Sequence, residues 1–278
     1  MGIFVPIVWA LGFTGAKAAM DQFPPIMLMA MRFSVAAIVL VWFTKPPWSL
    51  MWRIFIVTVI SATIPYSTIF TGLNHLDAST AMLVVQAQVP FMALVAIVFL
   101  KESLTIQRAI GFVVAMAGVV LIAGQPELRG SIGWILLTVG GCFVWASGQV
   151  MIRVLSQSID GKTLIAWVSV FTVPQLIISS AIFETGQIEA LMTADWYAWT
   201  LVLYMGLIMT AAGYYVWYTL LSKIEIGQAS PFLLLQPPIT VVASIFLLGE
   251  NPTWMTLIGG GIVIAGVATI TFESRQKK

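Results

Sequence analysis

Long apolar runs separated by short polar joins make up almost the whole sequence. A helix needs about 20 mostly apolar residues to cross the hydrocarbon core of a bilayer, whereas a membrane β-barrel shows alternating segments of about ten. The continuous runs therefore predict helices. We expect ten transmembrane helices, with the approximate ranges 2–17, 24–44, 52–73, 78–100, 105–123, 131–155, 163–184, 196–220, 227–248 and 253–272.

The composition supports a membrane protein and excludes most other classes. Of the 278 residues, 60% are hydrophobic and only 9% are charged. A soluble domain carries about 25% charged residues. The mean hydropathy of +1.00 is equally far from that class. A soluble enzyme, a nucleic-acid-binding protein and a disordered chain are excluded, so we predict an all-α polytopic membrane protein.

Cysteine and histidine are scarce, which limits the possible cofactors. Cys142 is the single cysteine and His75 the single histidine, so an internal disulfide and a histidine-rich metal site are excluded. We expect no metal and no cofactor. The expected partners are a small-molecule substrate and the lipid bilayer, with no nucleic acid. The oligomeric state stays open, a monomer being slightly favoured.

Lysine and arginine are distributed unevenly over the joins. One set of joins, together with the C-terminal tail, holds Lys45, Arg53, Lys101, Arg108, Arg153, Lys162, Lys223, Arg275, Lys277 and Lys278. The other set holds only Lys17 and Arg129, with the acidic Glu184, Glu189 and Asp195. Because basic joins stay in the cytoplasm, we expect both termini there and the chain in a bacterial-type inner membrane.

The chain contains two copies of one pattern. A shift of 148 positions superposes identical residues from the two halves: Tyr66 and Tyr214, Gln88 and Gln236, Pro90 and Pro238, Leu100 and Leu248, Glu102 and Glu250. A Trp-Ala-x-Gly stretch also recurs, beginning at Trp9 and at Trp145. Fixed-period self-similarity of this kind marks an internal repeat.

Each copy holds five predicted helices, an odd number, so the second copy enters the membrane from the opposite side. Such inverted repeats are typical of secondary transporters, because two related halves can exchange conformations around a shared central site. We assign residues 1–123 to the first repeat, 131–272 to the second and 273–278 to a basic cytoplasmic tail.

Several motifs carry a resemblance to a known superfamily. They are the stretch WALGFTGAK beginning at Trp9, Arg32 in the second helix, and in each half a proline-containing helix that ends in Leu-x-Glu, followed by a Thr-then-Gly helix. Over essentially its whole length the chain resembles the ten-helix EamA-like branch of the drug/metabolite transporter superfamily. Within that branch it is most similar to the YddG-type exporters of aromatic amino acids. The resemblance implies a transporter, in a branch that carries amino acids, drugs and metabolites.

All eleven acidic residues fall at or near the ends of the predicted helices. A carboxylate at mid-bilayer is costly and usually marks ion-coupling machinery. Its absence favours a facilitated or gradient-driven exporter and disfavours a purely cationic substrate.

Polar and aromatic side chains predicted to lie within the spans are the candidate binding residues. They are Trp9, Arg32, Tyr66, Gln88, Trp145, Tyr214, Trp217 and Gln236. Rings around a cavity can stack on an aromatic substrate or face an ammonium group, and a carboxamide can bind either end of a zwitterion. The alternative roles are ring packing, an interhelical hydrogen bond from each glutamine, and for Arg32 a structural cation instead of a partner for a carboxylate.

Four prolines mark the expected hinges: Pro65, Pro90, Pro237 and Pro238. Each removes a helix hydrogen bond and frees a carbonyl one turn earlier, which for Pro90 is that of Gln86. Lys17 and Arg153 lie near helix ends at matching repeat positions, and we expect both to extend to the lipid headgroups.

These observations predict a secondary exporter and not an enzyme. Its expected substrates are amino acids, aromatic and other hydrophobic ones, moved by alternating access through a central aromatic-lined cavity. A hydrophobic drug or another small metabolite is an alternative substrate, and a lipid scramblase is the alternative from another class. A nucleotide sugar is disfavoured, because only Arg32 could meet its phosphates inside the membrane.

Overall fold

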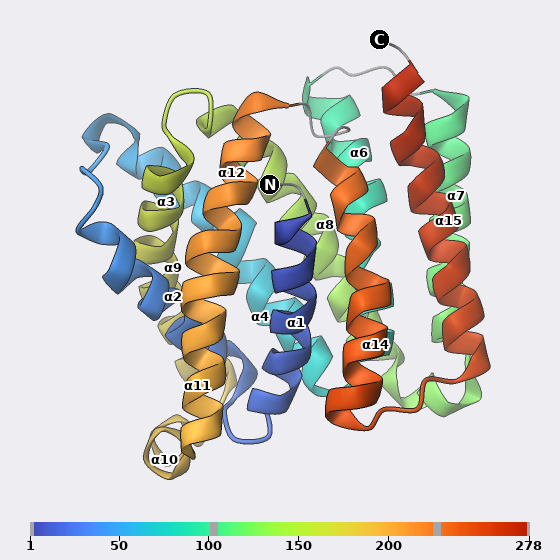
Figure 1. The fold of residues 1–278 in the computed structure, drawn as a ribbon, viewed down its shortest axis with the longest axis horizontal. Coiled ribbons are helices and arrows are strands. Elements are labelled where there is room, and N and C mark those ends of the chain that lie inside the picture. Colours follow the sequence, from blue (N-terminus) through green and yellow to red (C-terminus); the bar gives the residue numbers. More distant parts are fainter. Residues whose placement is uncertain (1–2, 101–104, 225–228, 277–278) are drawn as a thin grey trace.

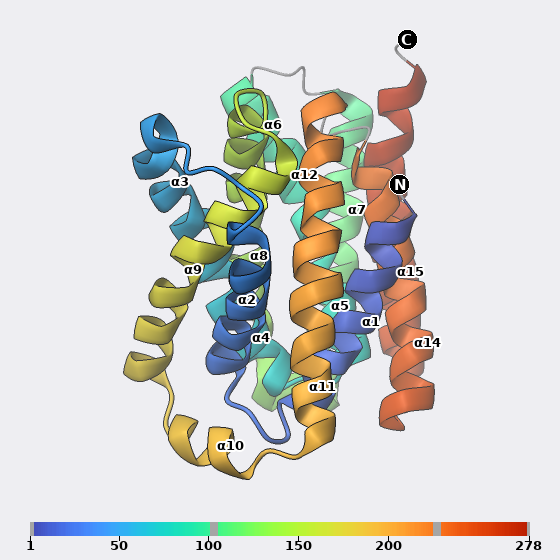
Figure 2. The same ribbon diagram turned by 60° about the vertical axis from the view of Figure 1, so that its left-hand side comes forward.

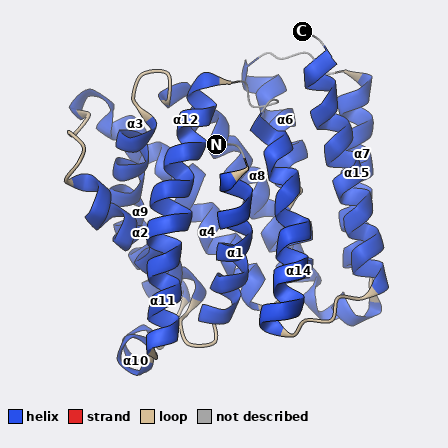
Figure 3. Cartoon of the chain, viewed as in Figure 1, coloured by secondary structure: helices blue, strands red, loops and turns tan. Residues whose placement is uncertain are grey.

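The structure is a computed structural model that describes residues 3–100, 105–224 and 229–276. Within these ranges the chain forms helices and no strand, as Figure 3 shows. The α-helices are α1 (Phe4–Ala19), α2 (Pro25–Val41), α3 (Met51–Thr58), α4 (Ile64–Asn74), α5 (Ala78–Val85), α6 (Gln88–Leu100), α7 (Ile106–Ala123), α8 (Ile132–Leu155), α9 (Gly161–Phe183), α10 (Gln187–Thr193), α11 (Trp196–Tyr204), α12 (Gly213–Lys223), α14 (Gln236–Leu248) and α15 (Trp254–Gln276).

Ten apolar segments of the structure correspond to the ten predicted spans. By length and composition, five are able to cross a membrane: Trp48–Asn74, Ala78–Phe99, Ile132–Leu155, Gly161–Phe183 and Trp196–Lys223. Five shorter apolar helices occupy the remaining predicted positions: Phe4–Ala19, Pro25–Val41, Ala109–Ala123, Phe232–Leu248 and Trp254–Ile270. The predicted all-α polytopic architecture is therefore confirmed.

The short helix α10 is an element that the sequence analysis did not predict. It lies in the join between α9 and α11, and in Figures 1 and 2 it stands at the end of the bundle opposite the C label. Gly186 precedes it in a left-handed conformation (φ 80°), which a residue without a Cβ adopts freely. A helix this short has no long apolar run, so the pattern that reveals the spans does not reveal α10.

The third helix of each repeat contains a π-helical segment. The segment η2 (Val59–Thr63) joins α3 to α4, and η4 (Met205–Ala212) joins α11 to α12. The 148-residue shift places η2 within η4. Pro65 follows η2 in the first turn of α4, inside one uninterrupted helical run, so its missing N–H leaves that run one backbone hydrogen bond short. Because π segments often occur at functional sites, these two direct attention to the middle of the bundle.

The fourth helix of each repeat is also interrupted, again at equivalent positions. The chain leaves α-helical geometry between α5 and α6, and in the second half the 3₁₀ segment η5 (Ser230–Leu235) precedes α14. Pro90 lies in the first turn of α6, and Pro237 with Pro238 in that of α14. The prediction that the Gln86 carbonyl stays free is wrong, because the Val89 N–H donates to it at 3.0 Å.

The repeated Trp-Ala-x-Gly stretches mark the points where the two halves cross. Gly12 in α1 lies against η4, and Gly148 in α8 lies against η2. A Cβ added to Gly12 would lie 2.3 Å from Met209 Sδ, and one added to Gly148 would lie 2.3 Å from Ser61 Cα. Each first helix therefore packs closely on the π segment of the opposite repeat, with no room for a Cβ unless the neighbouring atoms move.

The fifth helices, α7 and α15, form a second contact between the halves, at one edge of the bundle in Figure 1. A Cβ on Gly118 would lie 2.7 Å from the Gly259 carbonyl oxygen, and one on Gly266 would lie 2.3 Å from the Ala115 nitrogen. Small residues thus let the two backbones approach closely, as they do in membrane helix pairs generally.

Charged residues at the helix ends stabilise neighbouring helices. Lys17 Nζ donates to the Leu73 and Asn74 carbonyl oxygens, at 3.0 Å each, and so covers the C-terminus of α4. Arg153 Nη1 donates to the Leu221 carbonyl at 2.9 Å and also to that of Ile224, at the C-terminus of α12. Lys17 and Arg153, which were expected to extend to the headgroups, each donate to a helix C-terminus, where the partial negative charge attracts a cation.

Two glutamates play the opposite role at helix N-termini. The Glu184 carboxylate accepts from the Ile26 and Met27 N–H groups, at 2.6 and 3.0 Å, where α2 begins. Glu250 of the second Leu-x-Glu motif accepts from the Ala78 and Ser79 N–H groups, where α5 begins. Each pair joins elements far apart in sequence, so acidic residues at span ends serve architecture here.

Candidate functional site

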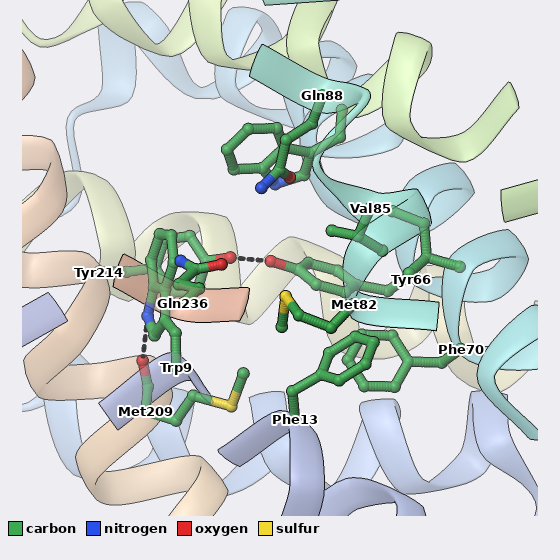
Figure 4. Close-up of a pocket in the computed structure, with 12 residues that line it drawn as sticks. Trp9, Phe13, Tyr66, Phe70, Met82, Val85, Gln88, Met209, Tyr214 and Gln236 are labelled. Carbon is green, nitrogen blue, oxygen red and sulfur yellow. Dashed lines mark hydrogen bonds between the residues drawn. The ribbon is translucent and has the colours of Figure 1, made fainter. Parts of the chain in front are cut away.

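A cavity of about 50 Å³ lies in the middle of the bundle, between the two repeats. It is walled by α1, α4, α5, α6, α8, α12, α14 and the segment η4. Its twelve lining residues are Trp9, Phe13, Tyr66, Ile69, Phe70, Met82, Val85, Gln88, Trp145, Met209, Tyr214 and Gln236. Six of the twelve are aromatic and none carries a charge, and Figure 4 shows how ten of them converge from different helices.

The walls of the cavity contain repeat-related pairs of residues. Trp9 and Trp145 occupy equivalent positions in the two Trp-Ala-x-Gly stretches. The 148-residue shift relates Tyr66 to Tyr214 and Gln88 to Gln236, and all four line the same space. Both halves therefore contribute the same kinds of side chain to one chamber.

Tyr66 and Tyr214 meet across the cavity, where their hydroxyl groups form a hydrogen bond (Figure 4). The Tyr214 ring lies 4.6 Å from the ring of Trp9, centroid to centroid. The Trp9 Nε1–H donates to the Met209 carbonyl oxygen at 3.1 Å, within the π segment η4. These contacts connect the first helix of one repeat to the third helix of the other, directly at the chamber wall.

The two glutamines supply polar groups to an otherwise apolar lining. Gln236 is 3% exposed, and its Nε2 has no hydrogen-bond partner among the described residues. Gln88 enters the cavity from the opposite repeat, at the upper edge in Figure 4. A buried amide donor without a partner is unfavourable, so a polar group entering this cavity would find a ready contact.

Six of the eight predicted binding residues line this cavity, and two do not. Trp217 is fully buried: its Nε1 donates to Gln149 Oε1 at 2.9 Å, and its ring packs on that of Trp9 at 5.6 Å. Arg32 is also fully buried, behind the rings of Tyr66 and Phe70. These two residues hold the wall in place without reaching the chamber.

Six lining residues are not among the predicted binding residues: Phe13, Ile69, Phe70, Met82, Val85 and Met209. Ile69 lies three residues after the predicted Tyr66 on α4, so helical spacing could have identified it. Val85 lies three residues after Met82 on α5, but neither of these two residues was predicted. The others are ordinary apolar residues in apolar helices. Nothing in their type separates a chamber wall from a lipid-facing surface.

The cavity is too small for an amino acid in this conformation. Ligand pockets usually measure about 300–1,000 Å³, whereas this one offers about 50 Å³. The space must therefore widen before it admits a solute, and the Tyr66–Tyr214 contact is the bond that spans it.

A larger hollow of about 440 Å³ lies at the α10 end of the bundle. It is lined by the loop between α1 and α2, by Asn74 and by α10, with Asp21 and Glu189 among the polar groups. Loops form most of its wall, and no two of its lining residues occupy equivalent positions in the two repeats. The central cavity is the better candidate, since both repeats contribute equivalent side chains to its lining and not to that of this hollow.

Ten apolar helices in two repeated halves, with a chamber where the halves meet, define a polytopic membrane transporter and not an enzyme. The chain belongs to the EamA-like transporter family, whose pattern matches residues 1–124 and again residues 132–272. The resemblance to the EamA-like branch seen in the sequence motifs is thereby confirmed.

Two relatives and one solved structure agree with this assignment. The chain is 27% identical to a probable amino-acid metabolite efflux pump of Salmonella typhimurium, over 100% of this chain and 96% of that protein. It is 26% identical to a probable terminal-alkyne amino-acid exporter of Streptantibioticus cattleyicolor, over 96% and 91% of the two chains. A crystal structure with 15% sequence identity covers 100% of this chain and 98% of its own, with a TM-score of 0.71, and so shares the fold.

Proposed function

We propose that this chain exports amino acids, aromatic and other hydrophobic ones among them, down a gradient of the substrate itself. Relatives that align over nearly their whole length are named as a probable amino-acid metabolite efflux pump and a probable terminal-alkyne amino-acid exporter, which supports this substrate class. The uneven distribution of lysine and arginine supports a bacterial-type inner membrane with both termini in the cytoplasm.

The observation that carries the proposal is the uncharged, ring-lined chamber shared by both repeats. Aromatic rings offer a large apolar contact to a hydrophobic side chain, and their faces attract an ammonium group. The amides of Gln88 and Gln236 add hydrogen-bonding groups for the polar end of the substrate. No carboxylate lines the chamber, which fits transport without a proton-binding acidic residue inside it.

The same symmetry supports alternating access. If the two repeats exchange conformations, an opening on one side of the membrane becomes an opening on the other. Pro65, Pro90, Pro237 and Pro238 directly follow the irregular segments, where bending disturbs the fewest helix hydrogen bonds, so we assign them the hinge role.

Efflux from proteoliposomes tests the proposal. Proteoliposomes loaded with labelled phenylalanine or tryptophan should release the label faster than protein-free vesicles loaded in the same way. The substitutions Tyr66→Ala and Trp145→Ala should slow that release. Trp42→Ala is the matched control, because this tryptophan is 82% exposed and lies outside the chamber. Release no faster than from protein-free vesicles would remove amino acids as the substrate, and release of a hydrophobic dye in their place would assign the chamber to drugs.

A further inference from the structure

Arg32 lies one ring layer away from the central cavity. Its Cζ is 4.9 Å from the centroid of the Tyr66 ring and 5.9 Å from that of Phe70. Both rings line the cavity, while the arginine side chain itself is 0% exposed. The guanidinium also faces the Phe33 ring at 5.1 Å. A positive charge is thus held directly behind the aromatic wall.

The hydrogen bonds of this guanidinium are incomplete. Nε donates to Thr210 Oγ1 at 2.6 Å, and Nη1 donates to Met29 Sδ at 3.5 Å. Nη2 has no hydrogen-bond partner in the part of the chain that the structure describes. Arginine keeps its proton in proteins, so this is a buried cation whose bonding partners are a hydroxyl and a weak sulfur acceptor. Inside a membrane such a group is costly, and a carboxylate is the partner that satisfies it best.

The tyrosine pair stands between this cation and the chamber. Arg32 contacts the Tyr66 ring directly, and through Thr210 it reaches the helix that carries Tyr214, one turn further along the chain. The hydrogen bond between the two tyrosine hydroxyls keeps the rings together. Because the cavity must widen to admit a solute, a separation of the two tyrosines would also shift the Tyr66 ring that covers the guanidinium.

We propose that Arg32 binds the carboxylate of the transported amino acid once Tyr66 and Tyr214 separate, an assignment that rests on the proposed export function. The carboxylate supplies the charged acceptor that Nη2 lacks. The ammonium group and the side chain stay in the chamber, against the rings of Trp9 and Trp145. A substrate without a carboxylate leaves the cation buried and unpaired, so the site rejects it.

Competition on the wild-type protein tests this assignment. Counterflow of labelled phenylalanine into proteoliposomes is measured against phenylalanine, 3-phenylpropionate, phenylalaninamide and phenethylamine. The two carboxylates should compete, and the amide and the amine should need concentrations about tenfold higher or more, as the loss of a charge-assisted contact predicts. If all four compete equally while counterflow proceeds, the assignment is overturned and the export function stands. If labelled phenylalanine shows no counterflow, the export function fails and the assignment with it.

Variants show whether Arg32 is the source of the discrimination. In Arg32→Gln the preference for carboxylates should fall to within about twofold, and Arg32→Lys should restore part of it, because an ammonium still attracts a carboxylate. Arg53→Gln is the control, since Arg53 is exposed at the end of the bundle. An Arg32→Gln protein that keeps the full preference overturns the assignment. If that variant does not fold, the wild-type competition series decides alone.

Discussion

Gly148 in α8 lies so close to Ser61 in η2 that a Cβ on the glycine would come within 2.3 Å of the serine Cα. The repeat-related contact joins Gly12 in α1 to Met209 in η4, where the added Cβ would meet the sulfur atom at 2.3 Å. The positions are equivalent, but one neighbour is backbone and the other is the far end of a flexible side chain. The two crossings therefore differ in how well they can adapt.

Alanine at the two crossings should have unequal effects. Overpacking costs about 1–3 kcal/mol, and we expect Gly148→Ala to reach that range because the Ser61 backbone cannot move aside. Gly12→Ala should cost less, since Met209 can change its rotamer. The measurement is the melting temperature of the detergent-solubilised protein. Gly140→Ala on α8 is the control, with nothing within 4 Å of its added Cβ, and equal losses at both crossings would contradict the asymmetry.

The cations that cover helix C-termini should be interchangeable. Lys17 and Arg153 bind backbone carbonyls at equivalent ends of α4 and α12, although one is a lysine and the other an arginine. A charge at a helix C-terminus contributes about 0.3–1 kcal/mol, so Lys17→Gln and Arg153→Gln should lower the melting temperature while Arg153→Lys should not. If Arg153→Lys melts as low as Arg153→Gln, the shape of the guanidinium and not its charge holds the end of α12.

The spans and six of the twelve chamber residues could be predicted from the sequence, for a physical reason. Lipid requires each crossing segment to satisfy its own backbone, so apolar helices are visible directly in the sequence. The repeat then relates Tyr66 to Tyr214, and the residues that an inverted pair brings to one centre are those with equivalent partners. The π segments could not be predicted, because Val59–Thr63 is ordinary apolar sequence. Its π geometry occurs where α8 packs against it, and that contact comes from the other half of the chain.

The position of Arg32 shows a second limit of prediction from the sequence. Its depth in the membrane follows from its position along the second span, but its direction depends on the rotation of α2 about its axis. Packing of α2 against α9 and η4 sets that rotation, and these elements lie far away in sequence. Sequence reasoning could therefore name Arg32 as a residue within the membrane without placing it behind the chamber wall.

Asp77 provides a prediction about pH. It lies in the join between α4 and α5, where burial and then the nearby Glu250 carboxylate raise its pKa above the ordinary 3.8, against the attraction of Lys17. When the pKa of a carboxyl group is higher in the folded state, the folded state loses stability as the pH rises from the ordinary pKa through the raised one. At neutral pH the charge on Asp77 therefore lowers the free energy of unfolding. Asp77→Asn should raise the melting temperature at pH 7, and the gain should disappear as the pH falls below about 4.

Asp195 is the matched control, with the opposite sign. Its pKa is lowered, first by the hydrogen bond from the Ala198 N–H and then by the Gln22 side chain. Its charge therefore stabilises the folded state above its ordinary pKa of 3.8, and this contribution is lost as the pH falls through the lowered value. Asp195→Asn should lower the melting temperature at pH 7. If both variants shift it in the same direction, the charge at Asp77 is not a penalty.

The Tyr66–Tyr214 hydrogen bond is the last contact to test, because it can be removed without removing either ring. A buried neutral hydrogen bond contributes about 1 kcal/mol, so Tyr66→Phe should raise the population of the open cavity about fivefold and speed amino-acid exchange if opening limits the rate. Tyr214→Phe should have the same effect, because it breaks the same bond from the other repeat. Exchange rates in proteoliposomes and the melting temperature are measured together, with Tyr197→Phe, an exposed tyrosine, as the control. Slower exchange in both variants would identify the hydroxyls as substrate ligands. A different exchange rate in the two variants would show that one hydroxyl has a role besides this hydrogen bond.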